Sequence, residues 1–359
     1  MGAGPSQVHP DVLRVMSNTT IGHLDPNMLV MMDELKDMLR YLFQTNNSMT
    51  FPVSGPGSLG MEACVNNMVE PGDKVLICIN GVFGTRMAEV ARRSGAEVIT
   101  TEDDWGKPVD PDKVKTAFGK NLGIKFMGFV HAETSTGVLS DAATLCQIAK
   151  EHEAYIIMDT VTSLAGVPVQ VDLWGADAVY SGSQKCLSCP PGLSPVTFSD
   201  KAVSLVEQRR HPVQSWLLDL SLVSAYWNSD GARTYHHTAP VNALMGLHEA
   251  LRRIVAEGLE AVWARHRECQ QQMVAGLSEL GFEMLVEKDF RLPELLTVFL
   301  PPNLEDSPAR AKLLEDHGIE ISAGLGPFAG KLWRIGMMGE AARTDNVDKL
   351  LSALQAMTN

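Results

Sequence analysis

The chain has 359 residues, of which 45% are hydrophobic and 20% charged, the proportions of an ordinary globular protein. Its 30 basic and 43 acidic side chains give a net charge of −13, which opposes binding to nucleic acid and to anionic membranes. No apolar run is long enough to suggest a membrane span, and the first residues, MGAGPS, lack the basic and apolar regions of a secretory signal, so we expect a cytoplasmic protein.

The N-terminal part is predicted to contain an arm, a helix, a strand and a second helix. The arm covers residues 1–15, and apolar residues at helical spacing mark a helix over 28–43. A strand over 49–53 then leads through the glycine-rich turn 54–60 into a helix over 61–69. Such a turn lets backbone N–H groups at the start of a helix bind a phosphate, although similar turns are common where nothing binds.

Two later strands end in residues of chemical interest. A strand over 74–79 is followed by Phe83, which either packs in the core or stacks on an aromatic cofactor. The strand over 155–159 ends at Asp159. A carboxylate in this position is costly unless it receives a positive partner, and a protonated pyridine nitrogen would be one. Capping of the following turn is the structural alternative.

Lys185 is the strongest candidate for a catalytic residue. It follows a strand over 178–180 and the small residues 181–183, and it precedes the Pro-Pro-Gly turn 190–192. Lysines almost always lie in solvent, but the neighbours here are apolar or thiol residues where a solvated loop would carry charge. A shielded lysine loses its proton more easily and can form a Schiff base. We therefore predict a pyridoxal phosphate enzyme anchored on Lys185.

The alternation of short strands and helices predicts an α/β protein with a large and a small domain. The large domain would cover residues 16–250, with a mostly parallel sheet between layers of helices, and the small α/β domain residues 251–359. A long helical stretch over 241–281, interrupted near Gly258, would join them. In the small domain Arg334 lies in a strand-like run and is either a salt-bridged structural residue or a bidentate carboxylate clamp.

The sequence gives only weak metal signals. Cys186 and Cys189 form a Cys-x-x-Cys without a second pair or histidines at ligand spacing, and the six cysteines are those expected of reduced thiols. The adjacent His236 and His237 would point to opposite sides of an extended chain. We therefore predict no metal site.

Taken together, these motifs resemble the class V aminotransferases, a group of fold-type I pyridoxal phosphate enzymes, and within it the alanine-glyoxylate and serine-pyruvate aminotransferases. The resemblance covers nearly the whole chain, from the arm to the Arg334 strand. Its most specific segments are SGSQK at 181–185 with PPG at 190–192, ETSTG at 133–137, YHHT at 235–238 and RIG at 334–336.

The resemblance implies a complete active site. Lys185 would be the Schiff-base and proton-transfer residue, Asp159 would face the pyridine nitrogen, and Arg334 would bind the substrate α-carboxylate. Residues around Gly4 would help to select the amino donor. Further cofactor contacts would come from Gly57, Ser58, Phe83, Ser135, Val161 and Gln184, and from Tyr235 and Thr238 of the partner subunit in a homodimer.

The implied reaction is the ping-pong transfer of an amino group from alanine or serine to glyoxylate or pyruvate. Relatives that use ureidoglycine, aminoethylphosphonate or pyridoxamine as donor are the alternative, and a non-catalytic protein of the same fold is a further one. Cysteine desulfuration would need a cysteine on a loop of the C-terminal domain, and no cysteine follows Cys269. Two departures from the family pattern bear on cofactor affinity: Pro56 stands where others carry serine in the phosphate turn, and Phe83 where many carry tryptophan.

Overall fold

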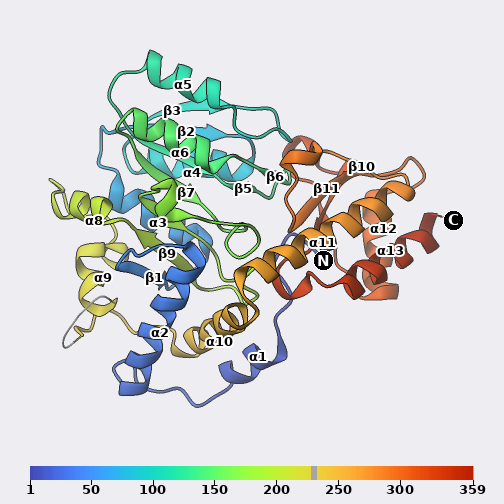
Figure 1. Cartoon of the computed structure of the whole chain (residues 1–359), viewed down its shortest axis with the longest axis horizontal. Helices are drawn as coiled ribbons and strands as arrows, with labels where there is room; N and C mark the ends of the chain where they lie inside the picture. Colours follow the sequence, from blue (N-terminus) through green and yellow to red (C-terminus); the bar gives the residue numbers. More distant parts are fainter. Residues whose placement is uncertain (228–232, 359) are drawn as a thin grey trace.

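The computed structural model of the chain describes residues 1–227 and 233–358. Two main sheets occupy separate parts of the molecule, and helices α10 (Val241–Glu257) and α11 (Leu259–Glu279) lead from one part to the other (Figure 1). Gly258, with a φ of +86°, separates these helices, which confirms the predicted break. The domain boundary predicted at residue 250 stays a prediction, and α10 runs across that position.

The large sheet has seven strands and is mostly parallel, as predicted. Its order is β1-β9-β8-β7-β4-β2-β3, and only β9 runs antiparallel to its two neighbours. β9 is not predicted from the sequence, because Pro195 interrupts a short apolar run of the kind that marks a buried strand. The strands are β1 (Met49–Val53), β2 (Lys74–Ile79), β3 (Glu97–Glu102), β4 (Ile124–Val130), β7 (Tyr155–Asp159), β8 (Ala178–Tyr180) and β9 (Ser194–Phe198).

Helices cover both faces of this sheet (Figure 1). α3 and α4 contact each other on one face, and α5 and α6 contact each other on the other, as right-handed crossovers require. α3 begins at Gly57, four residues before the predicted start, so the glycine-rich turn is itself the first turn of the helix. The helices of this part are α1 (Pro10–Met16), α2 (Pro26–Phe43), α3 (Gly57–Met68), α4 (Val82–Arg93), α5 (Pro111–Lys120), α6 (Ala142–Glu151), α7 (Val171–Trp174), α8 (Asp200–Glu207) and α9 (Leu220–Trp227).

The C-terminal part contains a four-stranded antiparallel sheet and a separate hydrophobic cluster. The cluster includes Trp333 and Ile335, which flank Arg334 on β13. The strand predicted at residues 320–321 lies two residues later. The elements are β10 (Glu283–Met284), β11 (Leu295–Phe299), β12 (Ser322–Ala323), β13 (Leu332–Gly336), α12 (Asp306–His317) and α13 (Thr344–Thr358), while a small hairpin of β5 (Ala132–Glu133) and β6 (Val138–Leu139) follows β4 in the large part.

Candidate active site

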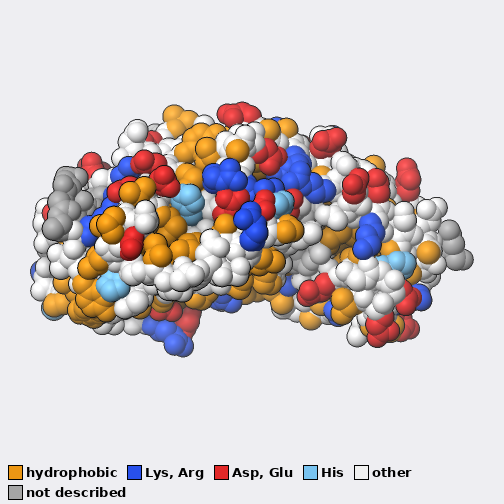
Figure 2. Space-filling view, turned by 90° about the horizontal axis from the view of Figure 1, so that it is seen from below, with side chains coloured by type: hydrophobic (Ala, Val, Ile, Leu, Met, Phe, Trp, Pro, Cys, Tyr) orange, Lys and Arg blue, Asp and Glu red, His pale blue; other side chains and the backbone are white. Residues whose placement is uncertain are grey.

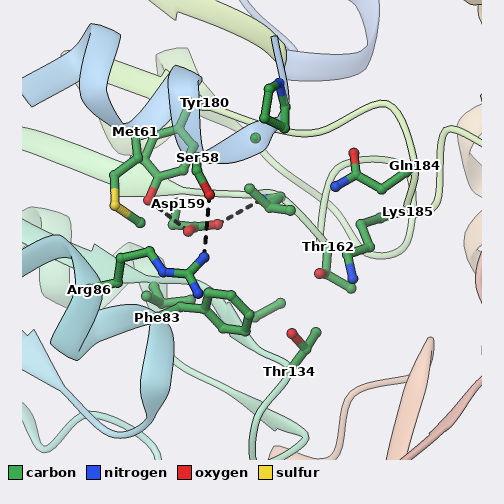
Figure 3. Close-up of a pocket in the computed structure, with 15 residues that line it drawn as sticks. Ser58, Met61, Phe83, Arg86, Thr134, Asp159, Thr162, Tyr180, Gln184 and Lys185 are labelled. Carbon is green, nitrogen blue, oxygen red and sulfur yellow. Dashed lines mark hydrogen bonds between the residues drawn. The ribbon is translucent and has the colours of Figure 1, made fainter. Parts of the chain in front are cut away.

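A cavity of about 130 Å³ lies at the carboxyl ends of the parallel strands of the large sheet (Figure 3). The first turns of α3 and α4, the end of β7 and the loop after β8 form its walls. The structure brings most of the predicted site residues together in this lining: Gly57, Ser58, Phe83, Asp159, Val161, Gln184 and Lys185.

Asp159 is a buried carboxylate that forms no ion pair among the described residues, although the positive charge of Arg86 acts on it. It is 3% exposed, and its oxygens accept hydrogen bonds from the Tyr180 hydroxyl at 2.7 Å and from the Val161 N–H at 2.8 Å. Burial raises the pKa of Asp159 to about 7, although both hydrogen bonds oppose this shift. Because neither donor is charged, the carboxylate can still receive a cation from the cavity.

Lys185 is half-buried and contacts the N-terminal arm. Its Nζ donates a hydrogen bond to the carbonyl of Ala3. The N–H of Ser6 donates to the carbonyl of Gln184, and the Ser6 hydroxyl donates to the carbonyl of Lys185. Burial lowers the pKa of Lys185 to about 8, and the positive charge of Arg334 adds to this effect. The sequence argument for a shielded lysine therefore agrees with its surroundings.

Gly4 is placed so that no other residue would fit without movement. A Cβ on Gly4 would lie 2.6 Å from Nζ of Lys185, and the φ of +101° itself disfavours side chains. The arm continues to the small sheet, where the Ala3 N–H donates to Oγ of Ser322 and the Gly336 N–H donates to the carbonyl of Met1. The arm thus connects the loop of Lys185 with β12 and β13 of the small sheet, and β13 is the strand that contains Arg334.

The start of α3 forms one end of the cavity. Pro56 is the N-cap of this helix and makes no side-chain capping hydrogen bond, and Gly57 and Ser58 follow it along the cavity wall. A Cβ on Gly57 would lie 3.2 Å from Val161, so glycine keeps this wall open. The N–H groups at a helix start carry partial positive charge and suit a phosphate.

Phe83 lies in the first turn of α4, which follows the end of β2. A buried carboxylate holds this turn: Oε2 of Glu133 accepts from the N–H groups of Phe83 and Gly84 at 3.0 and 3.3 Å. The other oxygen of Glu133 accepts from the Ser135 hydroxyl at 2.5 Å, and that hydroxyl accepts from the N–H of Val82. Glu133 therefore holds the backbone of the turn that carries Phe83, and sequence reasoning gave it no such role.

Ser135 has a different place from the predicted one. Its hydroxyl is fully buried and bonded to Glu133 and Val82, and it does not line the cavity. The neighbouring Thr134 does line the cavity (Figure 3). Thr134, and not Ser135, is therefore the residue of this loop at the cavity wall, and the contact of Ser135 with the cofactor ring stays a prediction.

Arg334 approaches the cavity from β13 of the small sheet. Its Nε donates to the carbonyl of Ala323 at 2.9 Å and its Nη1 to the carbonyl of Thr134 at 3.4 Å. It forms no ion pair with any carboxylate among the described residues. The described residues therefore offer no carboxylate for the structural salt bridge, and the guanidinium is free to pair with the carboxylate of a ligand.

Tyr235 and Thr238 lie outside the cavity of their own chain. The hydroxyl groups of these residues are 3.3 Å apart, and Tyr235 is 55% exposed. The histidines between them contact each other, with Nδ1 atoms 2.9 Å apart, so the expectation that their side chains point to opposite sides is wrong. No described group of three His, Cys, Asp or Glu side chains is arranged to hold a metal ion.

The cavity also contains residues that sequence reasoning missed. Tyr180 ends a short apolar strand, and its hydroxyl donates a hydrogen bond to Asp159. Arg86 reaches the cavity from the second turn of α4 and donates to Oγ of Ser58 at 3.3 Å (Figure 3). Helical spacing from Phe83 places Arg86 on the same side of α4, and this is the signal that could have identified it.

The lining fits pyridoxal phosphate. Asp159 offers a buried carboxylate for a pyridine nitrogen, and Lys185 offers an amine of lowered pKa for the aldehyde carbon. The start of α3 suits the phosphate, and Gln184 carries a buried amide oxygen without a partner in the described structure. Around one cavity, the carboxylate, the amine and the helix start therefore match the ring nitrogen, the aldehyde and the phosphate of this cofactor.

Comparisons with known proteins agree with this geometry. A family model described as aminotransferase class-V matches residues 2–339. The alanine–glyoxylate aminotransferase of Drosophila melanogaster is 39% identical over 99% of this chain and 90% of its own length. The (S)-ureidoglycine–glyoxylate transaminase of Bacillus subtilis is 36% identical over 99% of this chain and 89% of its own.

Solved structures give the same assignment. The crystal structure of an alanine–glyoxylate aminotransferase from Nostoc sp. superposes with a TM-score of 0.97 at 43% identity, covering 100% of this chain and 94% of that chain. Enzymes of this group depend on pyridoxal phosphate, for which the cavity described above is suited. The chain therefore belongs to the class V aminotransferase family and is a pyridoxal phosphate-dependent transferase of fold type I.

Proposed function

We propose that the protein transfers the amino group of a small amino acid, alanine or serine, to glyoxylate or pyruvate by a ping-pong mechanism. The observation that carries this proposal is the placement of Lys185 and Asp159 in one cavity, with Lys185 against the N-terminal arm and Arg334 bonded to the carbonyl of the lining residue Thr134. The alanine–glyoxylate aminotransferases among its relatives support the choice of substrates.

Each of these residues has a distinct proposed task. Bound pyridoxal phosphate supplies the electron sink for the carbanion at the substrate Cα. Asp159, held by Tyr180 and Val161, presents a negative charge to the pyridine nitrogen. Nζ of Lys185 would move the proton between the substrate Cα and C4′ of the cofactor, and its pKa of about 8 leaves more of the amine neutral near pH 7 than in a solvated lysine.

Arg334 orients the substrate in this proposal. Its guanidinium pairs with the α-carboxylate through planar donors and so fixes the position of Cα relative to Lys185. The backbone of Ala3 and Gly4 contacts Lys185 directly, which leaves little room beside the reactive nitrogen. A donor with a small side chain suits this arrangement.

We further propose a homodimer in which Tyr235 and Thr238 bind the cofactor phosphate of the partner subunit. Their exposure outside their own cavity supports this, as do the exposed apolar side chains of Leu13, Val30 and Tyr41 on α1 and α2. Figure 2, which views the molecule from below, shows apolar side chains gathered over its larger part. None of the described helices is long and apolar enough to cross a membrane, and a cytoplasmic location stays a prediction.

The test is a donor panel in single half-reactions. The purified holoenzyme is mixed with alanine, serine, glycine, aspartate or aminoethylphosphonate, without a keto acid, and the visible absorption band of the cofactor is followed. We expect alanine or serine to bleach the band and to release one keto acid per active site, with glyoxylate or pyruvate restoring it. Lys185→Ala is the control and should show no turnover.

The main alternative is a relative with an unusual donor. The similarity to the Bacillus subtilis ureidoglycine–glyoxylate transaminase favours ureidoglycine as the first such candidate, before aminoethylphosphonate or pyridoxamine. Ureidoglycine is therefore added to the donor panel; if it bleaches the band and alanine and serine do not, the proposed donor class is wrong while the aminotransferase assignment stands.

A further inference from the structure

Arg86 is a positively charged residue of the cavity that has no assigned task. Among the described lining residues, only Arg86 and Lys185 carry a positive charge. Arg86 forms no ion pair with a described carboxylate, and its side chain donates a hydrogen bond from Nη1 to Oγ of Ser58 at 3.3 Å. A guanidinium in such a position is available to an anion.

The position of Arg86 joins the two parts of the site that would hold the cofactor. Its guanidinium carbon lies 5.0 Å from the centre of the Phe83 ring, and its Nη1 reaches the first turn of α3 (Figure 3). Phe83 is the expected ring-stacking residue, and the first turn of α3 is the expected phosphate site. A cation between them would therefore lie next to the phosphate, which is the most negatively charged group of the cofactor.

The first turn of α3 needs such a cation more than an ordinary phosphate turn does. Pro56 has neither an N–H group nor a hydroxyl, so the turn offers backbone donors only from the residues that follow it. A phosphate monoester carries close to two negative charges near neutral pH. A guanidinium provides parallel N–H donors and a permanent charge, which match two phosphate oxygens.

We propose that Arg86 binds the phosphate group of pyridoxal phosphate, with Nη1 exchanging the Ser58 hydroxyl for a phosphate oxygen. This inference rests on the cofactor assignment and not on the identity of the amino donor. Arg86 then compensates for the donors that Pro56 removes. Its stacking on Phe83 holds the guanidinium in place, and the phosphate holds Ser58 and Arg86 together.

The experiment compares pyridoxal phosphate with pyridoxal, which has the same ring and aldehyde but no phosphate. Dissociation constants of both are measured on the apoenzyme by absorption titration for wild type, Arg86→Gln and Arg92→Gln. Arg92 is a matched control, because it is an exposed arginine on the same helix that does not line the cavity. We expect Arg86→Gln to weaken pyridoxal phosphate binding about 10- to 100-fold, with pyridoxal changed less than about twofold and Arg92→Gln unchanged.

Two results would overturn the proposal. Equal weakening of both ligands by Arg86→Gln would mean that Arg86 acts only through the Phe83 ring, and unchanged affinities would mean that it is not a ligand. Binding of pyridoxal also shows that the variant is folded. Should Arg86→Gln not fold, Arg86→Lys allows the same comparison, because lysine keeps the charge but loses the planar pair of donors. Weaker binding of pyridoxal phosphate alone supports the proposal. Equally weaker binding of both ligands, or no change in either, rejects it.

Discussion

The backbone of Gly4 lies directly against the side-chain nitrogen of Lys185, although the two residues are far apart in the sequence. A Cβ on Gly4 would be 2.6 Å from Nζ and 2.9 Å from Cδ of Lys185. Real Cβ atoms do not approach other atoms so closely, and the φ of +101° is a second obstacle to any side chain. The position of the reactive amine therefore depends on a glycine in the N-terminal arm.

We expect Gly4→Ala to lower stability and to weaken cofactor binding together. The positive φ costs about 1–3 kcal/mol for a residue with a Cβ, and the new methyl group would displace Nζ of Lys185. The free energy of unfolding and the dissociation constant of pyridoxal phosphate measure the two effects. Gly22→Ala is the matched control, since the atom nearest to its added Cβ is 4.0 Å away. Wild-type values for Gly4→Ala in both measurements would show that the contact is dispensable.

Tyr180→Phe should make cofactor binding more dependent on pH. The Tyr180 hydroxyl stabilises the ionised form of Asp159, whose pKa is already raised to about 7 by burial. Without this hydrogen bond the pKa of Asp159 rises further, so a smaller fraction is ionised to meet the pyridine nitrogen near neutral pH. The dissociation constant of pyridoxal phosphate, measured from pH 6 to 9, should increase most at pH 6 and approach the wild-type value at pH 9.

The control for this prediction is Tyr155→Phe, which removes a hydroxyl from the start of the same strand as Asp159. Its titration should follow that of wild type. A uniform loss of affinity at every pH in Tyr180→Phe would instead indicate a packing effect in the cavity floor.

The sequence was sufficient to predict that Asp159 and Lys185 lie near each other, because Asp159 ends one short apolar strand, Lys185 comes after another, and parallel strands end at one edge of a sheet. It was not sufficient to predict that Thr134 rather than Ser135 lines the cavity. Both are small hydroxyl residues of one loop, and the sequence does not indicate which of the two side chains faces the cavity. The hydroxyl of Tyr180 and the carboxylate of Glu133 act through tertiary contacts, which periodicity does not report. The early start of α3 was missed because glycine normally marks a turn, whereas here Gly57 is helical and keeps the cavity open.

Glu294 should make the stability of the protein depend on pH. This residue is fully buried, neither carboxylate oxygen has a described partner, and burial raises its pKa to about 8. Between its unfolded pKa of about 4.5 and its folded value, the folded protein holds a proton that the unfolded chain releases. Stability is therefore lost as the pH rises through this window, by up to about 1.4 kcal/mol per pH unit.

Glu294→Gln removes this titration while keeping nearly the same shape. Thermal midpoints of the wild type and the variant are compared at about pH 5, 6.5 and 8, which span the window. The midpoint of the variant should rise relative to that of the wild type as the pH increases. A difference that is constant with pH would show that Glu294 does not change its protonation on unfolding.

Arg334 provides the sharpest test of substrate orientation. Its Nη1 reaches the carbonyl of Thr134 at the cavity, and it has no described carboxylate partner, so a substrate carboxylate would be its first charged ligand. We expect Arg334→Gln to raise the KM for alanine roughly 100-fold, because a charge-assisted bidentate contact contributes about 3 kcal/mol. Arg334→Lys should recover only part of this loss, since lysine lacks the planar pair of donors.

A purely structural role for Arg334 would also raise KM, so the decisive readout is selectivity. Alanine and alaninol differ only in the carboxylate, and both can be followed through the loss of the visible cofactor band. The wild type should prefer alanine strongly, and this preference should collapse in Arg334→Gln. Lys331→Gln is the control, because Lys331 is an exposed cation just before the same strand. If Arg334→Gln slows both donors equally and keeps their ratio, Arg334 supports the site without binding the α-carboxylate.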